Sequence, residues 1–228
     1  ISAGVAVLGD SAGMQCATQG GIFDPSASCQ SSTPANISAG FSKANAYYAD
    51  TFTINDSTGN ISVLAPSDSR TRGYRTTLEA NAAIAWINSR NSGKPWMATV
   101  SFSAAHTPLQ QAPAALTPNT RTSGDSLNCS NQVQQRILQN QMTEAMDSEF
   151  GRLLVEIGLA TRNTDGTLNY NPRASNTMVV IVGDNGTLGP SVKLPFNPTR
   201  AKGTAYQTGV WVPLIVKFVM LFIGEPCN

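Results

Sequence analysis

The run from residue 177 to residue 183, Thr-Met-Val-Val-Ile-Val-Gly, is almost wholly apolar and rich in β-branched residues. Strands covered by helices on both faces have such continuous apolar runs, whereas half-exposed strands alternate between apolar and polar residues. The run stops at the polar residues Asp184 and Asn185, which Gly186 follows. We therefore expect residues 177–183 to form a buried strand of a parallel sheet that ends in a polar loop.

Two segments of the chain have apolar side chains at helical spacing. Residues 76–90 contain no Pro or Gly and predict an amphipathic helix. Its expected apolar face consists of Leu78, Ala82, Ala85 and Trp86. Residues 131–158 predict a longer helix, with Gln, Glu and Arg on its polar face. The apolar face of that helix is expected to hold Val133, Ile137, Met142, Met146, Phe150, Leu153, Leu154 and Ile157.

A second candidate strand lies between these two helices. Residues 96–103, Trp-Met-Ala-Thr-Val-Ser-Phe-Ser, form a short run typical of a buried strand. The order helix, strand, helix, strand favours an α/β fold with a mostly parallel mixed sheet flanked by helices. Residues 1–72 are rich in Gly, Ser, Thr, Asn and Pro and predict loops and short strands. Residues 73–228 should hold the α/β core, within one domain overall.

Composition narrows the class of protein. A chain of 228 residues with 41% apolar content can bury one sizeable core. Charged residues make up only 13%, well below the roughly 25% of an average soluble domain, and this favours a secreted or periplasmic protein. The formal net charge is +1 and the basic residues are scattered, so the basic patch of a nucleic-acid-binding protein is missing.

The cysteines and the two ends of the chain give weaker constraints. Four cysteines accompany a single histidine, which makes a Cys/His zinc site very unfavourable. The sequence leaves open both a local disulfide between Cys16 and Cys29 and free buried thiols.

The first residues lack the basic start and long apolar stretch of a signal peptide, so we expect a mature or truncated chain. Residues 210–224 are too few to span a bilayer and predict one or two buried strands.

Two polar clusters follow the two candidate strands. His106 comes shortly after residues 96–103, and Asp184 and Asn185 come directly after residues 177–183. If both strands run the same way, these side chains share the edge of the sheet at which ligands bind in α/β folds. A histidine beside an anion and two hard oxygen ligands beside a divalent cation would suit the cleavage of an ester.

Each of these residues also has a plainer interpretation. Asp-Asn-Gly is a common turn sequence, because Asn and Gly tolerate positive φ. A lone histidine such as His106 is often a core residue with satisfied hydrogen bonds. Lys202, in the sequence Arg-Ala-Lys-Gly-Thr, has the character of a solvated surface charge. The order in which the segments occur along the chain is what favours a functional site.

Four segments in this order resemble motifs of the sulfatase family. Pro-Trp-Met-Ala-Thr-Val-Ser-Phe-Ser-Ala-Ala-His-Thr-Pro-Leu-Gln, at 95–110, resembles the strand that ends in a histidine followed by Thr-Pro. Residues 142–154 are similar to the helix that precedes the metal-bearing strand. Val-Val-Ile-Val-Gly-Asp-Asn-Gly-Thr at 179–187 and the segment 199–216 resemble two further motifs. The resemblance spans residues 73–216.

This resemblance, which is to the arylsulfatase-like members of the alkaline phosphatase superfamily, implies hydrolysis of sulfate esters. It implies that Asp184 and Asn185 are calcium ligands, and that His106 and Lys202 are catalytic residues that bind the sulfate group. It also implies a formylglycine nucleophile, made from the first residue of a Cys/Ser-x-Pro-x-Arg motif. A phosphatase or phosphodiesterase of the same superfamily and a non-catalytic scaffold or binding protein are the alternatives.

The chain departs from the family pattern in several places. It contains no Cys/Ser-x-Pro-x-Arg sequence, since the segment Ser32-Thr-Pro-Ala-Asn36 has Asn in the place of Arg. The adjacent aspartates and the Lys-Trp-His segment of the family are also absent, and residues 217–228 are unusually apolar. We therefore expect a fragment that begins after the nucleophile, is inactive by itself, exposes a sheet edge, and binds calcium weakly or not at all.

Overall fold

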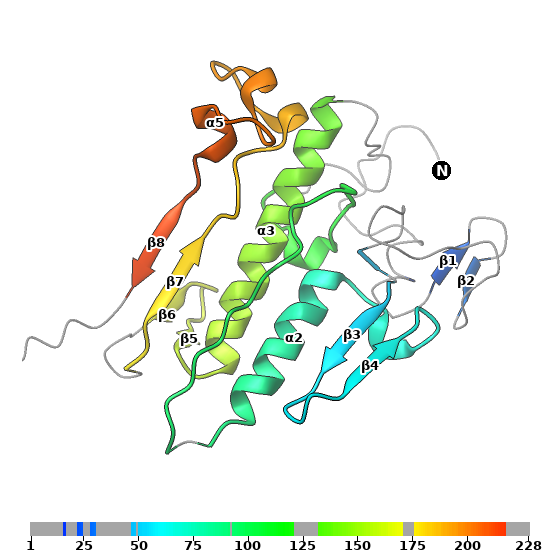
Figure 1. Ribbon diagram of the computed structural model, residues 1–228, viewed down its shortest axis with the longest axis vertical. Helices are drawn as coiled ribbons and strands as arrows, with labels where there is room; N and C mark the ends of the chain where they lie inside the picture. The colour runs from blue at the N-terminus through cyan, green and yellow to red at the C-terminus, as the bar shows by residue number, and fades with distance from the viewer. Residues whose placement is uncertain are drawn as a thin grey trace, which may run out of the picture. The chain divides into compact units, whose positions relative to one another are not determined.

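Figure 1 shows the computed structural model of the protein. Its elements belong to two compact units, Ile1–Leu153 and Leu154–Asn228. Among the described residues, every strand belongs to a two-stranded antiparallel sheet, so the expected parallel sheet is not found there. The structure describes residues 16, 22–24, 28–30, 47–48, 50–91, 93–120, 132–170 and 176–217.

The first unit opens with two short hairpins. Strand β1 (Ile22–Asp24) pairs with β2 (Ser28–Gln30), and β3 (Phe52–Asn55) pairs with β4 (Ile61–Leu64). The turn of the second hairpin is closed by the carboxylate of Asp56, which accepts hydrogen bonds from the backbone N–H groups of Thr58 and Asn60 at 2.8 and 3.0 Å. Such a side chain replaces a backbone acceptor within a turn.

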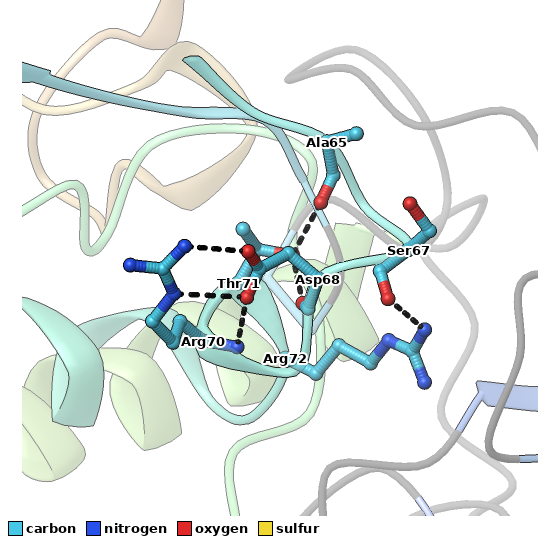
Figure 2. Close-up of polar contacts among 6 residues, drawn as sticks. All are labelled: Ala65, Ser67, Asp68, Arg70, Thr71 and Arg72. Carbon is cyan, nitrogen blue, oxygen red and sulfur yellow. Dashed lines mark hydrogen bonds and ion pairs between the residues drawn. The ribbon is translucent and has the colours of Figure 1, made fainter. Parts of the chain in front are cut away.

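A turn then leads from β4 toward the first long helix (Figure 2). The 3-10 helix η1 (Ser69–Thr71) is capped by Asp68, whose carboxylate accepts from the backbone N–H of Arg70 at 2.9 Å and pairs with its guanidinium at 2.7 Å. Arg72 is buried, and its guanidinium donates to the carbonyl oxygens of Pro66 and Ser67 at 3.0 and 2.7 Å. The buried charge therefore has the backbone acceptors that it requires.

Helix α2 (Arg75–Asn88) confirms the helix predicted at residues 76–90. Its expected apolar face is wrong, because the buried residues are Thr76, Ala80 and Ile87, and Trp86 is 43% exposed. Polar contacts join α2 to the next long helix, through Thr77–Glu149 at 2.7 Å and Asn81–Arg152 at 2.8 Å. Since this interface is partly polar, the apolar periodicity did not reveal which face is buried.

Helix α3 (Gln132–Glu156) confirms the second predicted helix. Its buried line includes Leu138, Met142 and Ala145, together with the polar residues Gln141 and Glu149. Several residues of the predicted stripe lie at the margin or outside, with Val133 61% exposed and Met146 and Phe150 half-buried. The buried Glu149 is stabilised by Thr77 and by its ion pair with Arg152 at 2.6 Å.

The segment from Gly93 to Thr120 links these helices without forming a strand, so the strand predicted at residues 96–103 is wrong. It contains one 3-10 helix, η2 (Ala114–Leu116). The hydroxyl of Ser148 on α3 donates to the carbonyl oxygen of Leu116 at 3.0 Å. The carboxylate of Glu144, also on α3, accepts the backbone N–H groups of Asn119 and Thr120 at 2.9 and 2.8 Å. Side chains of α3 therefore hold the end of this segment, at residues 116–120.

The second unit consists of two hairpin-like pairs and short helical turns. Strand β5 (Ala160–Arg162) pairs with β6 (Leu168–Tyr170), and β7 (Val179–Val182) pairs with β8 (Leu214–Lys217). Between β7 and β8 lie three short helical elements, which are η3 (Gly189–Ser191), η4 (Pro198–Arg200) and α5 (Gln207–Val210).

Strand β7 confirms a strand within residues 177–183, but not its expected environment. It is antiparallel to its partner, and Val180 and Val182 are 51% and 63% exposed. Strand β8 confirms a strand within residues 210–224, yet it too is exposed. The prediction that these strands are buried is wrong in both cases, because among the described residues each strand pairs only with the other, and its side chains are largely exposed. Residues 218–224 lie outside the described residues.

Two expectations about the chain's environment can also be compared with the structure. Cys16 is buried and disulfide-bonded, which excludes a free thiol at this position. The side chain of Cys29 lies outside the described part of the chain, so the expected pairing stays a prediction. No helix within the described residues is long and apolar enough to cross a membrane.

Candidate functional site

The turn after β7 carries Asp184 and Asn185 in the second unit. The hydrogen bonding between β7 and β8 continues for one residue beyond each strand. There the N–H of Gly183 donates to the carbonyl oxygen of Pro213 at 3.1 Å. Asp184 is exposed and Asn185 is half-buried, with its side-chain amide donating to the carbonyl oxygen of Gly186 at 3.2 Å. An exposed carboxylate thus stands at the carboxyl end of a strand, as predicted.

Two glycines hold this turn against helix α5, which lies at the end of the β7–β8 pair in Figure 1. The N–H of Gly186 donates to the carbonyl oxygen of Gly209 at 2.8 Å. A Cβ atom on Gly186 would lie 2.1 Å from the carbonyl oxygen of Thr208, and one on Gly209 would lie 2.3 Å from that of Thr204. Only residues without a Cβ allow the two backbones to approach so closely.

The same contact region fixes Lys202. Its backbone N–H donates to the carbonyl oxygen of Thr187 at 2.9 Å, and its own side chain is half-buried. The preceding Ala201 is buried, and its carbonyl oxygen accepts from the backbone and the hydroxyl of Thr204 at 3.1 and 2.8 Å. The loop that bears Lys202 is therefore joined to the turn that bears Asp184 by backbone hydrogen bonds.

His106 lies on an ordered turn of the first unit. Its backbone N–H donates to the carbonyl oxygen of Ser103 at 2.9 Å, and its side chain is exposed. The ring atom Nδ1 lies 2.8 Å from the carbonyl oxygen of Thr107. A carbonyl oxygen can only accept, so Nδ1 carries the proton in this contact. The opposite ring nitrogen, Nε2, is then the atom that can accept a proton, and it can donate to an anion once the ring is doubly protonated.

The structure brings together only part of the predicted site. Asp184, Asn185 and Lys202 belong to one cluster of loops in the second unit, whereas His106 belongs to the first unit. Their convergence on one sulfate group remains a prediction.

Four residues near these sites were not identified from the sequence. Gly186 and Gly209 lie within the motifs, and a glycine next to a polar turn is a recognisable signal of close backbone approach. Tyr47 and Glu79, which contact the turn of His106, have no local pattern that reveals them.

Burial raises the pKa of the Glu79 carboxyl above its ordinary value of 4.5, although two hydrogen bonds from Ser103 lower it.

The donor set can be compared with the needs of a calcium ion. Asp184 and Asn185 offer hard oxygen atoms of the type that calcium prefers, but calcium takes roughly six to eight such ligands. In the part of the chain that the structure describes, no three His, Cys, Asp or Glu side chains are grouped as a metal site requires. The residues present fit calcium in type and not in number.

Comparison with known proteins gives one match. The family model described as sulfatase matches residues 15–219 of the chain. The match begins well before residue 73, the first residue of the resemblance described above. It therefore includes most of residues 1–72, for which loops and short strands were predicted. Neither the curated proteins nor the solved structures contain a significant match to the chain.

Proposed function

The chain belongs to the sulfatase family, and from that premise we propose that it serves in the hydrolysis of sulfate esters. The observation that carries this proposal is the joining of two motifs in space. The turn with Asp184 and the loop with Lys202 are held together by the hydrogen bonds Lys202–Thr187 at 2.9 Å and Gly186–Gly209 at 2.8 Å. A carboxylate and an ammonium group thus lie on two loops that are joined to each other.

Each residue has a proposed role in this reaction. Lys202 would bind an oxygen of the sulfate group and stabilise the negative charge that develops on it. His106, through Nε2, would donate a hydrogen bond to the same group or to the leaving oxygen. Asp184 and Asn185 would contribute two oxygen ligands to a calcium ion. The ion would supply charge stabilisation, but these two ligands alone do not complete its site.

The nucleophile is a separate part of the proposal. A formylglycine would arise from a Cys/Ser-x-Pro-x-Arg sequence, and none occurs in these 228 residues. We therefore expect no turnover by the 228-residue chain alone. The buried disulfide cysteine Cys16 and the low content of charged residues support a secreted or periplasmic location, where disulfides persist.

A comparison of two ester classes tests this function. The protein expressed from its complete gene should hydrolyse an aryl sulfate and not the matching aryl phosphate. Lys202→Ala should lower kcat/KM by about 10²-fold or more, as loss of an oxyanion donor does. Lys193→Ala, which removes an exposed lysine of the same unit, should leave it unchanged. Turnover of the phosphate ester alone would identify a phosphatase instead, and turnover of neither ester would support a non-catalytic protein.

A further inference from the structure

The turn that bears His106 is held from one side by a buried tyrosine. The hydroxyl oxygen of Tyr47 lies 2.7 Å from the carbonyl oxygen of Ser103 and 2.9 Å from that of His106. Its single proton is therefore shared between two acceptors, which are the carbonyl oxygens of the first and last residues of the turn. The ring of Tyr47 is fully buried and stacks on Tyr74, with 6.1 Å between ring centroids. Burial raises the pKa of the hydroxyl, so it remains a donor.

A carboxylate holds the same turn from helix α2. One oxygen of Glu79 accepts the backbone N–H of Ser103 at 3.0 Å, and the other accepts the hydroxyl of Ser103. Since the carbonyl oxygen of Ser103 also receives the N–H of His106 at 2.9 Å, every polar group of Ser103 is bonded. Both ends of the turn, Ser103 and His106, are thereby fixed by Tyr47 or Glu79, although the imidazole itself is exposed.

We propose that Tyr47 and Glu79 are positioning residues that set the orientation of the His106 imidazole. This inference deepens the proposed function, since it rests on His106 acting on the sulfate group. The two residues do not touch the reacting atoms, and they act by fixing the turn from which the ring projects. Such fixing matters because a misplacement of about 1 Å in an active site can cost about 10²-fold in rate.

The chain offers a direct probe and a matched control. His106 is the only histidine, so one Hε1–Cε1 signal in a carbon-13 NMR spectrum reports its ring. Tyr47→Phe removes the hydroxyl and retains the buried ring. Tyr48→Phe makes the same change in the same aromatic cluster, where the hydroxyl of Tyr48 donates to the carbonyl oxygen of Gln111 at 2.6 Å. Ser103→Ala removes the hydroxyl bond to Glu79 and serves if Tyr47→Phe does not fold.

We expect Tyr47→Phe and Ser103→Ala to shift or broaden the His106 signal, and Tyr48→Phe to leave it in place. In the protein expressed from its complete gene, Tyr47→Phe should lower kcat by about tenfold or more with little change in KM. A His106 signal that is unmoved by Tyr47→Phe and Ser103→Ala would overturn the proposal, and so would an equal shift in Tyr48→Phe. If the signal shifts as expected but no sulfate ester is hydrolysed by the wild type, positioning of the ring stands and the proposed function fails.

Discussion

The N–H of Gly186 donates to the carbonyl oxygen of Gly209 at 2.8 Å, so a backbone hydrogen bond joins the turn after β7 to helix α5. No side chain can adjust at such a contact. The loops that bear Asp184 and Lys202 meet near this contact. Their positions therefore depend on Gly186 and Gly209, which have no reactive side chain.

Gly209→Ala should destabilise the protein. The new Cβ would lie 2.3 Å from the carbonyl oxygen of Thr204 and 2.6 Å from that of Ala201, and backbone atoms cannot yield without breaking the turn. We expect a loss of about 1–3 kcal/mol in the free energy of unfolding, measured by urea denaturation. Gly93→Ala is the control, because its Cβ would meet only the side chain of Asn91 at 3.5 Å. An equal effect of both substitutions would contradict the role of the glycine contact.

Asp50→Asn should destabilise the first unit strongly. The side chains of Asp50 and Arg75 form an ion pair and are 10% and 14% exposed, and the guanidinium also lies 5.6 Å from the centre of the Phe52 ring. The substitution removes the carboxylate and leaves the nearly buried guanidinium of Arg75 without this ion pair. Such a change typically lowers the free energy of unfolding by about 3–5 kcal/mol. Thermal and urea unfolding would measure the loss. Asp68→Asn breaks the more exposed pair with Arg70 (Figure 2), and it should cost much less.

The stability of the first unit should fall as the pH rises above about 4.5. Burial raises the pKa of Glu79 above this ordinary value, with hydrogen bonds from Ser103 and the charge of Arg75 opposing the shift. The folded protein then holds a proton that the unfolded chain has released. The stabilisation is therefore complete below pH 4.5 and is lost as the pH passes through the folded pKa.

Glu79→Gln should remove this part of the pH dependence. Urea unfolding from pH 4.5 to 7.5 would reveal it as a flatter curve for the variant than for the wild type. Parallel curves for Glu79→Gln and the wild type would show that the carboxyl of Glu79 titrates alike in the folded and unfolded states.

Calcium should bind the 228-residue chain more weakly than about 1 mM, the weak end of protein calcium sites. Asp184 and Asn185 supply only two side-chain ligands, and isothermal titration calorimetry would measure the affinity. Removal of calcium with EDTA should leave the unfolding midpoint unchanged. Tight stoichiometric binding that Asp184→Asn abolishes, and that Asp147→Asn on the exposed face of α3 does not, would show that other residues complete the site.

Inorganic sulfate should shift the NMR signal of His106 if the two units form one site. Lys202→Ala should weaken the apparent affinity read from that signal, because the ammonium group would bind the same anion. The control Lys193→Ala should not. A His106 signal that is unaffected by sulfate in the wild type would argue against a shared binding site for His106 and Lys202.

The sequence predicted well those features that depend on local patterns. Helices α2 and α3 lie where helical spacing places them, and β7 and β8 form where β-branched residues are concentrated. The buried faces were harder to predict, because α2 and α3 meet partly through polar pairs such as Thr77–Glu149. A hydrogen-bonded polar residue can be buried at little cost, and apolar periodicity does not register it.

The strand at residues 96–103 was predicted wrongly for a different reason. A strand exists only where a neighbour pairs with it, and the sequence of this segment does not specify one. In the structure, Ser103 bonds to Glu79 of α2 instead. Asp184 and Lys202 were predicted as site residues from family motifs, whereas the glycine contact that joins their loops is visible only in three dimensions.

Tyr47 bonds to two segments of the first unit, residues 103–110 and the start of α2. Its N–H donates to the side chain of Gln110 at 2.7 Å, its carbonyl oxygen accepts the N–H of Arg75 at 2.8 Å, and its hydroxyl holds the turn of His106. The start of α2 and the presentation of the imidazole are thus tied to a single residue. A substitution of Tyr47 would therefore disturb the beginning of a long helix and the turn of His106 at the same time.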